Sequence, residues 1–193
     1  MVGWTPPQNA AARYHRGWTG PGRSDIIRHL VIAIDPFEKL TSLAYGAAVA
    51  VTEIMAASSA HITLIVDDQF CDLVNVGEIA PDQVTFPVNY YYPLDAYPAA
   101  AERLLSHRGY LSTDTLDVVT EYIAQHPREI PASFMGVPIV AQGRVFGELF
   151  LARGEREPEF TIEDLALAMD LATVLGSRIP GVIAMEDEVA GDR

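Results

Sequence analysis

The chain has 193 residues, of which 49% are hydrophobic and 20% charged, and its net charge is −13. This length suits one domain with a sizeable core, and the composition is that of a globular protein. Because nucleic acids and anionic membranes are bound through Lys and Arg, the acidic balance argues against both as partners.

The N-terminal residues 1–24 are rich in Pro, Gly and Ala and show no apolar period, so we expect an irregular arm. Trp4 and Trp18 suggest that this arm packs on the body or on a partner chain. No apolar run approaches the ~20 residues of a membrane span, and the N-terminus lacks the apolar core of a secretory signal. We therefore expect a cytoplasmic protein.

Two helices are expected at the start of a domain that spans residues 25–182. Ser24 is a candidate cap for the first helix, which Pro36 ends, and Asp35 is a candidate cap for a second helix over residues 37–58. The middle of this second helix is small and apolar nearly all round, so it should be buried on more than one side. With a sheet on one side, a second copy of the chain is the natural cover for the other.

Three strands and then two helices are expected next along the chain. Residues 61–67, 73–78 and 83–92 read as strands, and residues 98–107 and 113–124 as helices.

The stretch over residues 133–153 predicts a hairpin around a tight turn at Gln142-Gly143. Pairing around this turn places Val140 opposite Val145, and residue 139 opposite residue 146. Apolar side chains then point to both faces, so the sheet should be covered on both sides.

The last helix is expected over residues 165–179. Thr161 and Asp164 form the pattern of a capping box at its start. The acidic residues 183–193 follow as a frayed tail.

This order of elements resembles that of a GAF domain, or of its relative the PAS domain. The stretch that favours GAF reads SFMGVPIVAQGRVFGELFLA and is followed by EFTIEDLALAMDLATVLGSRI. It is similar to the family's C-terminal signature, which has Ser-Phe-Leu-Gly-Val-Pro-Ile, a short turn, Val-Phe-Gly-x-Leu-x-Leu, and then Phe-Thr-x-x-Asp opening the last helix. Residues 93–114 also resemble the middle of such domains. The resemblance implies an α/β (α+β) fold with a central antiparallel sheet of five to six strands and helices on both faces.

The resemblance also implies a role in signal transduction of the bacterial type. GAF domains are mostly modules that sense small molecules or dimerise and pass a signal to an output domain. No output domain is recognisable in this sequence. We therefore expect a homodimer through residues 37–58 and 161–179 that acts on a separate output protein.

In the family, the ligand cavity lies between the sheet and the inserted helices, and this chain is rich in tyrosine there. An aromatic pocket with polar hydroxyl tips is one interpretation. The other is that these side chains only pack the core, which would leave a ligand-free dimeric adaptor. The candidate ligand-binding residues are Tyr90, Tyr92, Tyr97, Leu104, Tyr110, Tyr122, Ser133 and Met135.

Haem is a separate hypothesis, because the chain is similar to the GAF domains of redox- and oxygen-sensing histidine kinases. Those domains carry a proximal histidine in the loop before their signature, and His126 lies in that loop. Two departures argue against a haem ligand here. His126 stands seven residues before Ser133, two more than the family spacing, and Phe150 replaces the tyrosine near the gas site.

No catalytic constellation or metal site is expected. Cys71 is the only cysteine, which excludes an intramolecular disulfide and the chemistry of the GAF-fold enzyme that reduces free methionine sulfoxide. Asp67 and Asp68 read as turn residues. His61 has no partner at a metal-ligand spacing. We expect a non-catalytic module whose ligand the sequence does not name.

Overall fold

The computed structural model describes residues 22–77, 90–125 and 131–191. Most of the expected N-terminal arm, with Trp4 and Trp18, therefore lies outside the described residues, as does His126. The helices are α1 (Arg23–Ile34), α2 (Leu40–Met55), the short 3-10 helix η2 (Leu94–Ala96), α3 (Pro98–Leu105), α4 (Leu116–Gln125) and α5 (Ile162–Gly191). The strands are β1 (Ser59–Val66), β2 (Gln69–Gly77), β3 (Tyr90–Pro93), β4 (Tyr110–Leu111), β5 (Ser133–Ala141) and β6 (Arg144–Arg153).

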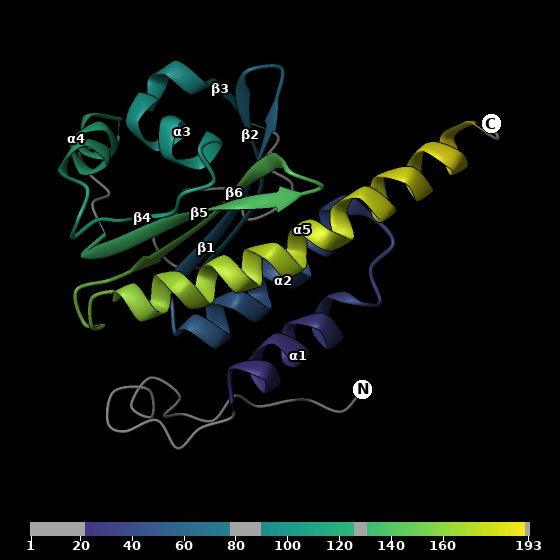
Figure 1. Ribbon diagram of the computed structural model, residues 1–193, viewed down its shortest axis with the longest axis horizontal. Helices are drawn as coiled ribbons and strands as arrows, with labels where there is room; N and C mark the ends of the chain where they lie inside the picture. Colours follow the sequence, from purple (N-terminus) through teal and green to yellow (C-terminus); the bar gives the residue numbers. More distant parts are fainter. Residues whose placement is uncertain (1–21, 78–89, 126–130, 192–193) are drawn as a thin grey trace.

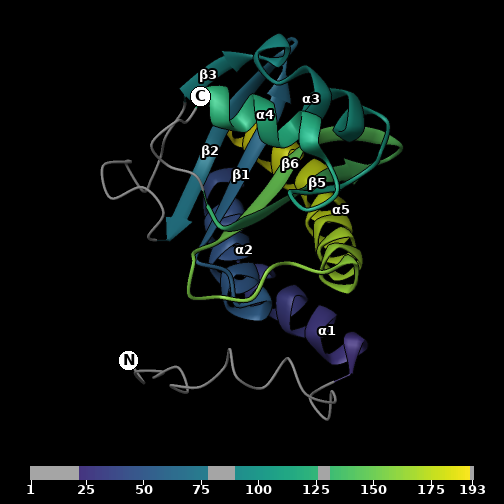
Figure 2. The same cartoon turned by 90° about the vertical axis from the view of Figure 1, so that its left-hand side faces the viewer.

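The strands form one six-stranded sheet in the order β3-β2-β1-β6-β5-β4, and every neighbouring pair is antiparallel. Helices α1, α2 and α5 lie on one side of this sheet, and α3 and α4 lie on the other (Figures 1 and 2). The predicted α+β architecture, with an antiparallel sheet of five to six strands between two helical layers, is confirmed.

The β5–β6 hairpin turns at Gln142 and Gly143, whose φ angles of 50° and 74° are both positive, as a two-residue turn of type I′ requires. Val140 pairs with Val145 as predicted. The predicted pairing of Ile139 with Phe146 is wrong, because a register shift between residues 139 and 140 brings Ile139 opposite Gly147. An extra residue of this kind is a β-bulge, which the apolar pattern alone does not reveal.

The boundary between the first two helices differs from the prediction. Asp35 keeps helical dihedral angles and its backbone N–H donates to the carbonyl of Val31 at 3.0 Å. It therefore ends α1 and does not cap the next helix. The cap residue of α2 is Lys39, and α1 is preceded by Gly22 where Ser24 was expected as the cap.

Helix α2 is covered from within its own chain. Its small residues Ala44, Ala47 and Ala48 are buried in one core cluster with Leu30 and Ile34 of α1. Helix α5 packs on α2 as well. These intrachain contacts provide at least part of the cover that was expected from a second copy of the chain.

Helix α5 begins with the predicted capping box. The backbone N–H of Asp164 donates to Thr161 Oγ1 at 3.2 Å, and the N–H of Thr161 donates to Asp164 Oδ2 at 2.9 Å. The helix does not end near residue 179 but continues through Pro180 to Gly191. The residues 183–191 that were expected as a frayed tail are thus helical.

By length and composition alone, residues Ile162–Met185 of α5 could cross a membrane. In the fold, however, the apolar side of this helix packs on β5, with Ala168, Leu171 and Leu175 buried in the main core. Gly176 allows the close approach, since a Cβ at this position would overlap the backbone carbonyl of Val140. Burial in the core therefore accounts for part of the apolar composition of the helix, since 39% of its apolar window is buried.

Candidate functional site

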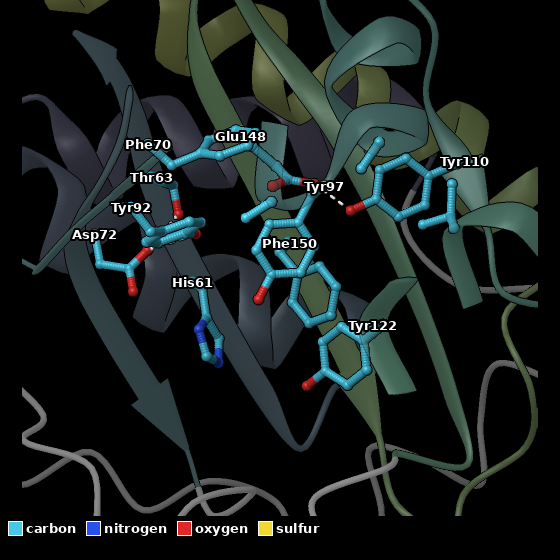
Figure 3. A pocket seen from close by; sticks show the side chains of 13 residues that line it. His61, Thr63, Phe70, Asp72, Tyr92, Tyr97, Tyr110, Tyr122, Glu148 and Phe150 are labelled. Carbon is cyan, nitrogen blue, oxygen red and sulfur yellow. Dashed lines mark hydrogen bonds between the residues drawn. The ribbon is translucent and has the colours of Figure 1, made fainter. Parts of the chain in front are cut away.

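A cavity of about 300 Å³ lies between the sheet and the layer formed by η2, α3 and α4 (Figure 3). This volume is at the lower end of the range for small-molecule sites, about 300 to 1,000 Å³. The cavity is lined by His61, Thr63, Phe70, Asp72, Tyr92, Ala96, Tyr97, Ala100, Tyr110, Val118, Tyr122, Glu148 and Phe150.

The alternation of side chains along each strand decides which residues reach the cavity. On β6, Glu148 and Phe150 line it, whereas Leu149 between them is buried in the main core on the opposite face. On β1, Thr63 lines the cavity and its neighbour Ile62 belongs to the main core. One face of the sheet thus supplies the core and the other supplies the cavity wall.

Three polar residues stand side by side across the sheet. Thr63 on β1 pairs with Asp72 on β2 and with Glu148 on β6, and we call these three the polar row. The Thr63 hydroxyl donates to Asp72 Oδ1 at 3.0 Å, and the Tyr92 hydroxyl donates to the same oxygen at 3.0 Å. Directly opposed residues have Cβ atoms about 5 Å apart, so two carboxyl groups flank one threonine in the cavity wall.

Glu148 is the most deeply buried acid of the cavity wall, with 7% of its surface exposed. Burial raises its pKa to about 7; the hydrogen bond from Tyr110 opposes this shift, and the nearby charge of Asp72 adds to it. The Tyr110 hydroxyl donates to Glu148 Oε1 at 2.5 Å. Gly136 makes room for this pair, because a Cβ at this position would overlap both Glu148 Oε1 and the Tyr110 hydroxyl.

Aromatic rings form most of the remaining wall. The ring centroids of Phe70 and Tyr92 are 5.3 Å apart, and that of Tyr97 lies 5.5 Å from Tyr92. On the other side, Tyr122 stacks on Phe150 at 5.7 Å with an interplanar angle of 7°. Burial raises the pKa of Tyr92 and likewise that of buried Tyr110, so these two hydroxyl groups stay neutral and can donate hydrogen bonds.

The structure brings four of the predicted candidates together. These are Tyr92, Tyr97, Tyr110 and Tyr122, all of which line the cavity. For Tyr90, only the backbone pairing within β3 is described, and its side chain lies outside the described residues.

The other three candidates lie elsewhere. Leu104 is fully buried in the core cluster beneath α3 and does not line the cavity. Ser133 is buried, and its hydroxyl accepts a hydrogen bond from the N–H of Phe160 at 2.9 Å. Met135 belongs to the main core on the opposite face of the sheet. The structure therefore gives these residues packing and structural contacts in place of a position on the cavity wall.

Sequence reasoning did not select the acidic residues Asp72 and Glu148, or Thr63 between them. The signal for Glu148 was present, because it is the charged residue within an apolar strand that was expected to be covered on both faces. A charge in such a position must be buried and needs a partner.

No group of three or more His, Cys, Asp or Glu residues in the described part of the chain is arranged to hold a metal ion. Cys71 is buried in β2.

A family model described as "GAF domain" matches residues 40–179. No curated protein matches the sequence. The fold is similar to the GAF domain of a phosphoenolpyruvate-protein phosphotransferase from Acinetobacter, with a TM-score of 0.63, 18% identity, and coverage of 89% of this chain and 98% of that one. A methyl-accepting chemotaxis protein fragment, residues 122 to 287, gives a TM-score of 0.65 at 16% identity and covers 79% of this chain and 96% of its own.

The chromophore-binding domain of the bacteriophytochrome RpBphP3 from R. palustris is also similar, with a TM-score of 0.63 and 14% identity. The match covers 84% of this chain but only 62% of that domain. At these identities the structural likeness establishes the fold alone.

Proposed function

The chain belongs to the GAF domain family, and on that basis we propose that it is a non-catalytic sensory or regulatory module whose cavity binds a small-molecule ligand. The solved structures similar to it include the chromophore-binding domain of a bacteriophytochrome and part of a chemotaxis protein. Both proteins belong by name to sensing systems, which supports the same class of function here.

The observation that carries this proposal is the cavity of about 300 Å³ with hydroxyl and carboxyl groups on an aromatic wall. A packed core leaves few voids larger than a water molecule. It also places polar groups where they have partners, whereas Glu148 accepts a hydrogen bond only from Tyr110 among the described residues. An open, polar and aromatic cavity is the usual form of a small-molecule site.

The proposal is tested by filling the cavity. Ala100 lines it from α3 and is 5% exposed, so Ala100→Phe should occupy the ligand space. Ala124 on α4 is exposed, and Ala124→Phe is the matched control. In a thermal-shift screen of metabolite-sized compounds, we expect at least one compound to raise the Tm of the wild type and of the control by about 5 °C. The same compound should leave Ala100→Phe unchanged.

Native mass spectrometry of the freshly purified protein gives a second readout, since a retained ligand adds its mass to the wild type and not to Ala100→Phe. Two outcomes would overturn the proposal. One is a thermal shift of equal size in the wild type, Ala124→Phe and Ala100→Phe. The other is no thermal shift with any compound, together with only the ligand-free mass.

Haem does not fit the cavity residues. The thirteen lining residues include the carboxyl groups of Asp72 and Glu148 but no Lys or Arg to pair with the two propionate groups of haem. Phe150, which stands where the haem-binding relatives have tyrosine, is one of the lining residues.

For signal output, we propose a homodimer that acts on a separate partner protein. Helix α1 lies on the outside of this layer, against α2 and α5 (Figure 1). Both α1 and α5 expose large apolar side chains, which supports this proposal. Val31 is 43% exposed, Ile32 65% and Met185 41%. A homodimer through this layer would also serve the alternative function, that of a ligand-free adaptor.

The dimer is tested by Ile32→Asp, which places a charge on the outer side of α1. Ile123→Asp, on the opposite layer where Ile123 is 39% exposed, is the matched control. Sedimentation should show a monomer for the first variant and a dimer for the control, with unchanged circular dichroism. A wild type that is already monomeric would contradict the dimer.

A further inference from the structure

The wall of the cavity is acidic and aromatic. Among its thirteen lining residues are two carboxyl groups and six aromatic rings other than imidazole, but no Lys or Arg. His61 is the one side chain of the wall that can carry a positive charge. A ligand with a phosphate or carboxylate would therefore lose its hydration without gaining a strong positive partner.

Glu148 is the residue of this wall whose charge would be stabilised most by a positive ligand. It is 93% buried, and within the described residues its hydrogen-bond donor is the neutral Tyr110 hydroxyl. A buried carboxylate without a cation nearby is costly, and a positive group placed beside it lowers that cost. Figure 3 shows the carboxyl group of Glu148 in the cavity wall, joined to the Tyr110 hydroxyl by this hydrogen bond.

The rings around Glu148 suit a cation as well. A positive group is attracted to the face of an aromatic ring when it lies within about 6 Å of the ring centroid. Phe70, Tyr92 and Tyr97 form one cluster of rings, and Tyr122 with Phe150 forms a second. Apolar parts of a ligand can contact these rings while its charge lies near the polar row.

We propose that the cavity selects a small organic cation, a primary or quaternary ammonium compound, whose positive group lies beside Glu148 and against the tyrosine rings. This inference rests on the proposed function, because it names the chemical class of the ligand for the same cavity. It goes beyond that function by assigning the ligand's charge and the residue that selects it.

The test compares compounds that share a carbon skeleton and differ in charge. The probes are choline with its neutral isostere 3,3-dimethylbutan-1-ol, and a set of primary amines with the matching alcohols and carboxylates. Binding is measured by calorimetry and thermal shift for the wild type and for Glu148→Gln, which keeps the shape and removes the charge. We expect the cations to bind the wild type more tightly than their neutral partners, and Glu148→Gln to weaken cation binding by about 30-fold. Binding of the alcohols should change little.

The pH dependence of choline binding gives an independent readout, because the charge of choline is fixed. A bound cation favours the ionised form of Glu148, whose pKa is about 7 in the free protein. Affinity should therefore rise by about tenfold between pH 6 and pH 8 in the wild type and stay nearly flat in Glu148→Gln. The variant His61→Gln shows whether the imidazole of His61 contributes to this pH dependence. The other titratable groups that line the cavity with Glu148 are His61 of β1, Asp72 of β2, Tyr92 of β3, Tyr97 before α3, Tyr110 of β4 and Tyr122 of α4.

The outcomes distinguish this inference from the function on which it rests. If neutral or anionic compounds bind the wild type as tightly as their cationic partners and fail to bind Ala100→Phe, the cavity is a ligand site and the cation inference is wrong. Cation binding that Glu148→Gln leaves unchanged also overturns it. If no compound of any charge distinguishes the wild type from Ala100→Phe, the proposed function itself is wrong.

Discussion

The two faces of the sheet differ in the polar groups and the space that they enclose, although the same strands supply both. The face toward α1, α2 and α5 is apolar, with Ile62, Val137 and Leu149 fully buried in one large cluster. The face toward α3 and α4 carries the polar row and a cavity. The first face therefore holds the fold together, and the second leaves polar groups available to a ligand.

The single strand β6 shows this difference in two charged residues. Arg153, on the apolar face, is 4% exposed and donates to the carbonyls of Met55 at 2.5 Å and Ala56 at 3.2 Å. It also contacts Asp164 and lies 3.9 Å from the centroid of the Phe160 ring. Glu148, five residues earlier, has one hydrogen-bond donor within the described residues, the neutral Tyr110 hydroxyl. A buried charge with many partners is structural, whereas one with few is a candidate for binding.

The largest effect is expected from removing the structural charge. Arg153→Met keeps much of the apolar stem but leaves carbonyls at the end of α2 and before α5 without their donor. Hydrogen bonds to charged groups contribute about 1.5 to 3 kcal/mol each, with losses that do not add fully, so we expect unfolding free energy to fall by about 4 kcal/mol. Urea denaturation measures this loss of unfolding free energy. Exposed Arg156→Met is the control and should change stability by less than about 0.5 kcal/mol; an equal effect of both variants would contradict the structural role.

A second prediction compares the two faces by the same substitution. Ala172 on α5 is fully buried in the main core, where Phe has no space, so Ala172→Phe should cost about 3 kcal/mol. Ala100→Phe places the same ring in the cavity and should change stability by less than about 1 kcal/mol. Both are read from thermal or urea unfolding. Equal losses would mean that the cavity is not open.

Removing the charge of Glu148 should stabilise the protein at neutral and higher pH. Its pKa is raised from 4.5 to about 7 in the folded state. The folded protein thus keeps this proton where the unfolded chain releases it, and stability falls as pH rises from 4.5 to about 7 and then levels off. We expect Glu148→Gln to be more stable than the wild type by about 2 kcal/mol at pH 8 and by less than half of that at pH 5. Exposed Glu163→Gln is the control. A constant difference across this range would show that Glu148 does not titrate in this way.

The features predicted correctly from the sequence depend on residues close together in the chain. The turn at Gln142-Gly143 and the capping box of Thr161 and Asp164 each follow from local backbone chemistry. The bulge on β6, at the residue between Val145 and Gly147, could not be predicted, because the apolar pattern is compatible with either register. The end of α1 at Asp35 was missed for a related reason: an aspartate before a proline can end one helix or start the next.

Only some of the residues of the cavity wall could be predicted from the sequence. Tyrosines near α3 and α4 stood out by their number, since buried tyrosine must satisfy its hydroxyl. The polar row did not, because Thr63, Asp72 and Glu148 become neighbours only through the strand order β2-β1-β6. Strand alternation gives the face of each residue, but the pairing of distant strands decides which of them meet.

The smallest effect is expected within the polar row itself. Asp72 Oδ1 accepts from both the Thr63 hydroxyl and the Tyr92 hydroxyl, so Thr63→Val or Tyr92→Phe alone leaves the other donor in place. Each should cost about 1 kcal/mol. Because the two donors share one acceptor, the double variant should cost at least 0.5 kcal/mol more than the sum, a coupling typical of residues in one hydrogen-bond network. Thr173→Val, on the exposed side of α5, is the control for losing a hydroxyl. Strict additivity in urea denaturation would mean that the two hydroxyls act on Asp72 independently, and that the polar face is no more cooperative than the protein surface.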